Sequence, residues 1–322
     1  MSGTGARHHY SIFGLELASD LALPELRPVE PSPGAPDILI EVGEIADPGR
    51  APGLSKTADG ALLVVDEVAR YAVRGGSHIL VEPRPGTPPA NVRLFLLGSA
   101  MGLLIHQRGL LPLHGNAIEI DGRAFAFVGH SGAGKSTLAA WFHDHGYRIL
   151  SDDVCVVRFD AAGNPVLSAG IPRLRLWREA IEASGRVSGA YDRSYAGDES
   201  YDKYDVPVAA AATADGALPL AAVYSLRRGD GFNVNRLGPV DSAEVLFANT
   251  YRGAYLDQTA TNALHWQACL DVVRRVPVFD FVRAWTLDSL GEQAGQVAAH
   301  ARALATQPLR RDTLRTVERR TG

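Results

Sequence analysis

The chain has 322 residues, of which 46% are hydrophobic and 21% are charged, and its formal net charge at pH 7 is −4. This length accommodates one large domain or two ordinary ones with an ample core, and the composition is typical of a soluble globular protein. The negative net charge argues against general nucleic-acid binding.

Three further features bear on the cellular compartment. The only cysteines, Cys155 and Cys269, fit a reducing cytosol better than a disulfide scaffold. The N-terminus lacks a basic segment followed by an apolar core, so we expect no secretory signal. The longest largely apolar stretch, residues 94–105, is too short to span a membrane and indicates a buried helix. We therefore expect a cytoplasmic protein without a membrane partner.

Residues 1–90 carry short strand patterns and no catalytic motif. Gly75-Gly76 predicts a hairpin between the last two strands, and the proline-rich stretches 27–36 and 84–89 predict a long loop and a boundary. We expect an N-terminal β-rich domain over residues 1–90 that acts as a scaffold. The alternative is a docking module that presents a strand edge to a peptide. The strands are expected at residues 37–42, 62–65, 69–73 and 78–81.

A helix from residue 91 to about 108 leads into a second part of the chain, which contains a phosphate-binding pattern. The apolar run 124–128 predicts a buried strand, and residues 138–142 predict a helix that ends by Gly146. Between them the sequence fits G-x-x-x-x-G-K-[ST], which places backbone N–H groups and a helix N-terminus around a phosphate. The loop consists of Gly129, His130, Ser131, Gly132, Ala133, Gly134, Lys135, Ser136 and Thr137.

Two side chains of this loop have defined tasks in a P-loop. Lys135 would reach the β- and γ-phosphates, and the Ser136 hydroxyl would hold Mg²⁺. The alternative is a chance match in a glycine-rich loop. The strand before the loop and the helix after it argue against chance, as does the presence of only three lysines in the whole chain.

Two carboxylates and a histidine accompany the loop. Asp152 and Asp153 follow the apolar residues 147–150, so they lie at the end of the next predicted strand, beside the phosphates. One carboxylate can bind Mg²⁺ and the other can accept a proton from an attacking hydroxyl. The plainer alternative is a turn or a helix cap. His114-Gly115 precedes the loop by fifteen residues, and His114 alone would be interpreted as a packed structural histidine.

Together, His114-Gly115, the loop from Gly129 to Ser136 and Asp152-Asp153 resemble the HPr kinase/phosphorylase family. These are bacterial serine kinases whose fold is related to phosphoenolpyruvate carboxykinase. The resemblance covers roughly residues 110–160 well and the remainder weakly. In that family the second aspartate activates the substrate serine and the histidine supports it, so the resemblance assigns these roles to Asp153 and His114. Asp152 would then help to hold the metal or orient the base.

The chain also departs from the family. Bifunctional members carry a glutamate-rich, glycine-rich segment about forty residues beyond the loop lysine, whereas residues 170–179 here are arginine-rich. Residues 10–15, 172–177 and 249–252 look similar to HPr-kinase-like proteins that accompany ribosomal peptide (RiPP) clusters. Some of those are lasso peptide kinases, which phosphorylate a C-terminal serine of the precursor. HPr kinases are hexamers, which leaves a homo-oligomer as an open expectation.

The segment after the aspartates holds the candidate substrate contacts. Arg173 and Arg175 alternate with leucines, so in a strand both would point to one face and clamp a phosphate, or form only a solvated face. Residues 184–206 lack apolar periodicity and predict a mobile loop near the site, or a disordered insert, with Lys203 at its end. Four tyrosines lie there (Tyr191, Tyr195, Tyr201 and Tyr204). Residues 286–306 have helical character, followed by a basic tail from Arg310.

The sequence thus predicts an α/β protein, with a P-loop kinase core of the HPr kinase/phosphoenolpyruvate carboxykinase type over residues 91–322 and the N-terminal β-rich domain. The expected reaction transfers a phosphoryl group from Mg²⁺-ATP to a serine hydroxyl of a peptide or small protein. His114, Lys135, Asp152 and Asp153 would be catalytic, and Ser136 and Asp152 would hold the metal. The alternatives are a kinase for a small-molecule hydroxyl and a nucleotide-sensing regulator that transfers no phosphate.

Overall fold

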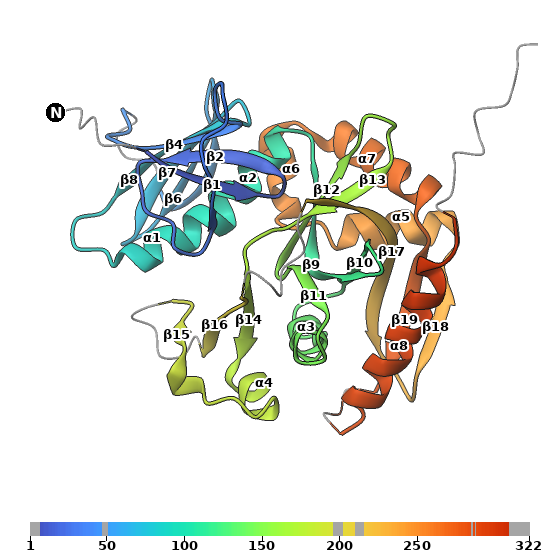
Figure 1. The fold of residues 1–322 in the computed structure, drawn as a ribbon. Helices are drawn as coiled ribbons and strands as arrows, with labels where there is room; N and C mark the ends of the chain where they lie inside the picture. Colours follow the sequence, from blue (N-terminus) through green and yellow to red (C-terminus); the bar gives the residue numbers. More distant parts are fainter. Residues whose placement is uncertain are drawn as a thin grey trace, which may run out of the picture.

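The protein is a mixed α/β structure with two eight-stranded sheets and one three-stranded sheet (Figure 1). The computed structural model describes residues 7–46, 51–195, 202–209, 216–284, 286 and 288–308. The predicted tail from Arg310 and the predicted loop residue Tyr201 lie outside these ranges.

The N-terminal sheet contains all the strands that the sequence predicts before residue 84. Its strand order is β3-β1-β2-β4-β8-β7-β6-β5. Gly75 and Gly76 turn the chain between β7 and β8 with φ angles of 55° and 65°, which glycine adopts without steric cost. The strands are β1 (His8–Ile12), β2 (Leu15–Ser19), β3 (Arg27–Pro28), β4 (Ile38–Val42), β5 (Gly53–Lys56), β6 (Gly60–Val65), β7 (Ala69–Arg74) and β8 (His78–Pro83).

One long helical segment covers this sheet and leads out of it. It consists of α1 (Pro89–Phe95), a π-helical turn η1 (Leu96–Ala100) and α2 (Met101–Gln107). The segment is longer than the predicted apolar stretch. Its 19 residues and mean hydropathy of 1.2 meet the length and composition of a membrane span. However, 67% of its most apolar 18-residue stretch is buried inside the protein. Burial against the sheet, where Leu96 and Leu103 join the same core as Ile12 and Tyr71, is typical of a core helix.

The second large sheet partly closes on itself. Its order is β10-β9-β12-β13-β17-β19-β18, and β10 also pairs with β17, so five strands form a ring. Strands β10, β17 and β19 are parallel, and their carboxyl ends therefore share one edge. The strands are β9 (Leu111–Ile120), β10 (Arg123–Val128), β11 (Arg148–Ser151), β12 (Val154–Phe159), β13 (Pro165–Ser168), β17 (Ala217–Arg228), β18 (Asn233–Arg236) and β19 (Val278–Arg283).

Strand β10 shows how this sheet is covered on both faces. Phe125 and Phe127 pack in one core with α3 (Lys135–Asp144) and α8 (Leu290–Ala305). The alternate residues Ala124, Ala126 and Val128 pack in another core with α5 (Pro239–Ala248) and α7 (Asn262–Arg275). Burial on both faces explains why the strand is apolar throughout. Two short helices, η4 (Gly253–Tyr255) and α6 (Leu256–Thr259), lie between α5 and α7 in the chain.

The third sheet corrects the prediction of a mobile loop for residues 184–195 and 202–206, whereas residues 196–201 of that prediction lie outside the described ranges. This segment contains η2 (Ser188–Ala190), β15 (Asp192–Arg193) and the start of β16 (Lys203–Pro207). Strand β16 pairs with β14 (Arg173–Trp177), which places Tyr204 opposite Leu176 and Val206 opposite Leu174. All four side chains are buried over α3 and α4 (Arg178–Ala183). The alternation of only two apolar residues is too short to predict from the sequence, because its partner strand is distant in the chain.

Candidate active site

The glycine-rich loop runs from the end of β10 to the first turn of α3, as predicted. Gly134 caps the helix in the left-handed region, with φ of 74°. This backbone conformation favours glycine, and the absence of a side chain lets the guanidinium of Arg283 lie close to the loop. The loop places the unpaired N–H groups of the helix start at the edge where the carboxyl ends of β10, β17 and β19 meet. Such an edge is where ligands bind in open α/β sheets.

Lys135 lies inside the loop. Its side-chain ammonium donates to the carbonyl oxygens of Gly129, at 2.7 Å, and His130, at 3.0 Å. The residue is only 7% exposed, and this burial lowers the pKa of Lys135 to about 8. A cation buried in this way gains more from a bound anion than a solvated lysine would.

Ser136 and Asp152 form a pair of oxygen donors next to the loop. The Ser136 hydroxyl donates to Oδ1 of Asp152 at 3.1 Å, and the backbone N–H of Arg175 donates to Oδ2 at 2.8 Å. Burial raises the pKa of Asp152. A hydroxyl and one carboxylate fit Mg²⁺, which is usually bound by one or two carboxylates together with substrate phosphates and water. Within the described ranges no group of three or more His, Cys, Asp or Glu side chains could hold a metal by itself.

Asp153 occupies a sharp corner of the chain. Strands β11 and β12 both pair with β9, one after the other, and Asp153 connects them with φ of 77°. Its carbonyl oxygen accepts hydrogen bonds from the backbone N–H of Gly115, at 3.3 Å, and from Nδ1 of His114, at 3.1 Å. A Cβ atom at position 115 would lie 2.4 Å from the carbonyl oxygen of Phe127. His114-Gly115 thus fixes the aspartate corner against β9, and β9 against β10.

The carboxylate of Asp153 lies near the cations Arg175 and Lys203 and beside the imidazole of His114. Its Oδ2 lies 3.1 Å from Nη1 of Arg175, and its Oδ1 lies 3.7 Å from Nδ1 of His114. Burial by itself would raise the pKa of Asp153, but the charges of Arg175 and Lys203 outweigh burial and lower the pKa below its usual value. Asp153 is therefore ionised at neutral pH, with a side chain that remains partly accessible.

Arg173 and Arg175 point to one face of β14, as their alternation predicts, and a carboxylate meets them there. Asp205 on β16 binds Nη1 of Arg173 through Oδ2 at 2.7 Å and Nε of Arg175 through Oδ1 at 3.2 Å. Arg175 therefore bridges Asp205 and Asp153. The guanidinium groups form part of the wall that holds Asp153, and a phosphate contact by either arginine stays a prediction.

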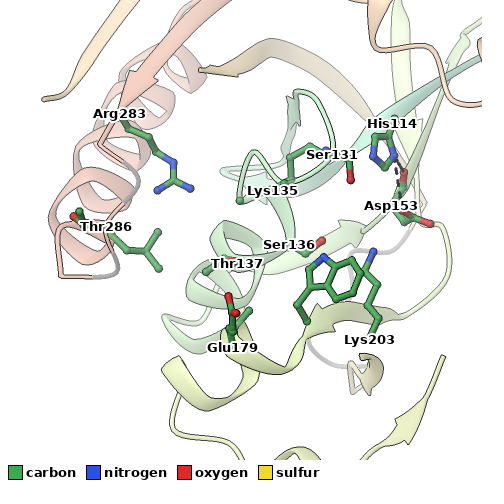
Figure 2. A pocket seen from close by; sticks show the side chains of 15 residues that line it. His114, Ser131, Lys135, Ser136, Thr137, Asp153, Glu179, Lys203, Arg283 and Thr286 are labelled. Carbon is green, nitrogen blue, oxygen red and sulfur yellow. Dashed lines mark hydrogen bonds and ion pairs between the residues drawn. The ribbon is translucent and has the colours of Figure 1, made fainter. Parts of the chain in front are cut away.

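Two cavities meet at Asp153. The first, of ≈450 Å³, is bounded by the glycine-rich loop, the start of α3, α4 and the region between β19 and α8. The second, of ≈440 Å³, is bounded by residues 129–131, Arg175 and the turn 248–252. Four residues line both cavities (His114, Ser131, Asp153 and Lys203). Figure 2 shows the first cavity, where the amine of Lys203 points toward the Asp153 corner.

Several lining residues were not predicted from the sequence as site residues. Arg283 ends β19, is only 4% exposed and points toward the loop from the opposite wall of the first cavity (Figure 2). Its Nη2 lies 3.5 Å from the carbonyl oxygen of Ala133. The available signal was an arginine at the carboxyl end of an apolar strand, which becomes informative only once β19 is known to be parallel to β17. Others are Trp177, Glu179, Thr286 and Leu290 in the first cavity, and Tyr251 and Arg252 in the second.

Comparison with known proteins adds little to this geometry. No protein-family model matches the sequence, and a search of curated proteins found no match either. Among solved structures, the chain is similar to the Hpr(Ser) kinase/phosphatase from Coxiella burnetii, with 14% identity and a TM-score of 0.30. The match covers 59% of this chain and 95% of the other. The neighbour bears the name of the family that the motifs resemble, but a TM-score this low carries no argument about fold or function.

Proposed function

We propose that the protein is an ATP-dependent kinase that phosphorylates a serine hydroxyl of a peptide or small protein, such as the C-terminal serine of a lasso precursor peptide. One observation carries the proposal. A single ionised carboxylate, Asp153, lies where the cavity of the glycine-rich loop meets a second cavity that could admit an acceptor. A nucleotide-sensing regulator has no need for the second cavity, whereas a kinase needs both.

The donor would bind in the first cavity. The N–H groups of residues 132–137 and the ammonium of Lys135 would hold the phosphates, once Lys135 exchanges its two carbonyl partners for phosphate oxygens. Ser136 and Asp152 would hold Mg²⁺, which neutralises charge on the phosphates when it is bound. Arg283 and Lys203 would offset the charge of the transferring group from opposite walls.

The acceptor hydroxyl would enter from the second cavity and contact Asp153. Its oxygen forms a bond to the γ-phosphorus while the bond from that phosphorus to the β–γ bridging oxygen breaks, so ADP leaves. The hydroxyl proton passes to the carboxylate of Asp153 and then to solvent. The lowered pKa of Asp153 makes it a weak base. This is acceptable where the transition state is loose, because the hydroxyl is oriented first and loses its proton late.

Formation of ADP by the purified protein, with and without serine peptides, tests the proposal. We expect ADP and phosphopeptide in equal amounts, and neither from Lys135→Ala, because that substitution removes the cation of the loop. Lys56→Ala on the edge strand β5 is the matched control and should retain the wild-type rate. Equal turnover in the wild type and Lys135→Ala would show that the loop is not the active centre. Turnover with small hydroxyl compounds alone would favour the small-molecule alternative.

Two buried free cysteines fit our proposal of a cytoplasmic location.

A further inference from the structure

The turn 249–252 forms a rigid wall of the second cavity. The backbone N–H of His114 donates to the carbonyl oxygen of Asn249 at 2.7 Å, and the backbone N–H of Tyr251 donates to the carbonyl oxygen of Pro112 at 2.9 Å. From behind, Nε2 of the buried His106 donates to the carbonyl oxygen of Tyr251 at 2.8 Å. The turn is therefore joined both to β9, which carries His114, and to the helix α2.

The ring of Tyr251 packs directly on that helix. A Cβ atom at Gly102 would lie 3.0 Å from the ring, and one at Gly98 would lie 3.4 Å from its hydroxyl oxygen. Two glycines one helical turn apart thus leave a flat surface for the ring. The next residue, Arg252, has a left-handed backbone with φ of 53°. A non-glycine residue in this region carries a conformational cost that tertiary contacts must sustain, and such residues are frequent at functional sites.

The side chain of Arg252 is exposed at the second cavity. Its guanidinium carbon lies 5.6 Å from the ring centroid of Tyr251 and 5.9 Å from that of Tyr255, so two aromatic rings orient it. Among the described residues no carboxylate lies within 4 Å of this guanidinium, whereas Arg173 and Arg175 both have carboxylate partners. Arg252 thus presents an oriented fork of N–H donors without an anionic partner from the described protein.

Cations outnumber carboxylates in the lining of this cavity. Arg175, Lys203 and Arg252 line it, and among the described residues the one carboxylate in its lining is Asp153, which is already bound to Arg175. With Arg175 paired to Asp153, the charges of Lys203 and Arg252 remain, and this positive excess attracts an anion. A planar guanidinium is well suited to bind a carboxylate through two parallel hydrogen bonds.

We propose that Arg252 is a specificity-determining residue that binds a carboxylate of the acceptor, so that the enzyme selects hydroxyl groups lying close to a carboxylate. The inference rests on the proposed function and specifies its acceptor. Both a peptide whose last residue is serine and a small hydroxy acid offer this chemistry. The amide of the same peptide retains the hydroxyl but lacks the charge.

Equilibrium binding tests the inference without turnover. The protein is saturated with Mg²⁺ and a non-hydrolysable ATP analogue, and acetyl-Gly-Gly-Ser is titrated as the free acid and as the C-terminal amide. We expect the free acid to bind roughly tenfold to a hundredfold more tightly, as for a charged hydrogen bond. Arg252→Gln should reduce this ratio to about one. Arg274→Gln, which removes a guanidinium paired with Asp271 on α7 and outside both cavities, should preserve it.

The outcomes separate the two proposals. A wild-type ratio near one, or an unchanged ratio in Arg252→Gln, would overturn the role of Arg252. Glycerate binding that depends on Arg252, without peptide binding, would support the carboxylate site and identify a small acceptor. If the ATP analogue does not bind, the proposed kinase function is refuted. The ratio of acid to amide affinity still tests whether Arg252 binds a carboxylate. Thermal unfolding of both variants verifies that each is folded.

Discussion

Replacing Asp153 by asparagine tests the carboxylate as a proton acceptor without changing the backbone of the site. The residue has φ of 77°, a region that asparagine tolerates better than most residues, so the corner between β11 and β12 should persist. The two bonds to its carbonyl oxygen, from Gly115 and His114, do not involve the side chain. The substitution therefore removes one negative charge and one proton acceptor and leaves the backbone of the site in place.

The expected effect on turnover is large. Loss of a positioned base typically costs about 10²–10⁴-fold in rate. The lower part of that range is expected here, because cations already lower the pKa of Asp153 and its proton affinity contributes little to the transition state. Binding of Mg²⁺-ATP should change much less, because Asp152 and not Asp153 contacts Ser136.

Single-turnover kinetics and nucleotide titration measure the two quantities independently. Asp152→Asn is the matched control: it should weaken Mg²⁺-ATP binding, since it alters the pair with Ser136. The opposite pattern, with the kinetic defect in Asp152→Asn and the binding defect in Asp153→Asn, would reverse the assignment of the two roles. An Asp153→Asn enzyme with the wild-type rate would refute the base altogether.

Two further predictions concern stability. Gly115→Ala should lower the free energy of unfolding by about 1–3 kcal/mol, because its Cβ atom would lie 2.4 Å from a backbone oxygen of β10. The control is Gly295→Ala in α8, where an added Cβ atom would meet no neighbouring group within 4 Å. Equal urea midpoints for the two variants would contradict the argument. Burial lowers the pKa of His265 to about 4, below the ~6.5 of an unfolded chain, so the unfolded state binds the proton first and stability should fall by up to about 3 kcal/mol as pH decreases from 6.5 to 4. Urea unfolding at pH 7 and pH 5 should show about 2 kcal/mol of this loss in the wild type and a smaller loss in His265→Gln. Identical losses in the two proteins would assign the effect to other groups.

The parts of the site that are local in the chain could be predicted from the sequence. The strand before Gly129, the glycine turn and the helix after Lys135 are contiguous, and each is specified by its own pattern. The Asp152-Asp153 pair follows the next apolar strand, and its position at the sheet edge follows from that. The alternation of Arg173 and Arg175 likewise predicts that both point to one face.

The parts that depend on pairing between distant segments could not be predicted. Asp205 neutralises Arg173 and Arg175 only because β16 pairs with β14 in one particular register. Arg283 reaches the loop because β19 is parallel to β17 and β17 to β10, an order that no local pattern encodes. Residues 184–206 have few apolar side chains, and their strand structure depends on burial of Tyr204 and Val206 against a core that lies elsewhere in the chain.

The contact between Gly102 and Tyr251 implies that the N-terminal part of the molecule affects the acceptor side of the site. Because a Cβ atom at Gly102 would lie 3.0 Å from the Tyr251 ring, Gly102→Ala must displace the ring by a few tenths of an ångström and with it the adjoining Arg252. The atoms nearest to that Cβ position belong to Tyr251 and Arg252, which line the second cavity. We therefore expect a severalfold increase in KM for a carboxylate-bearing acceptor, with the KM for ATP unchanged. Steady-state kinetics with each substrate varied in turn measure this separation. Gly295→Ala, far from the turn, should leave both constants unchanged, and a rise in the KM for ATP alone would show that the helix acts on the donor side instead.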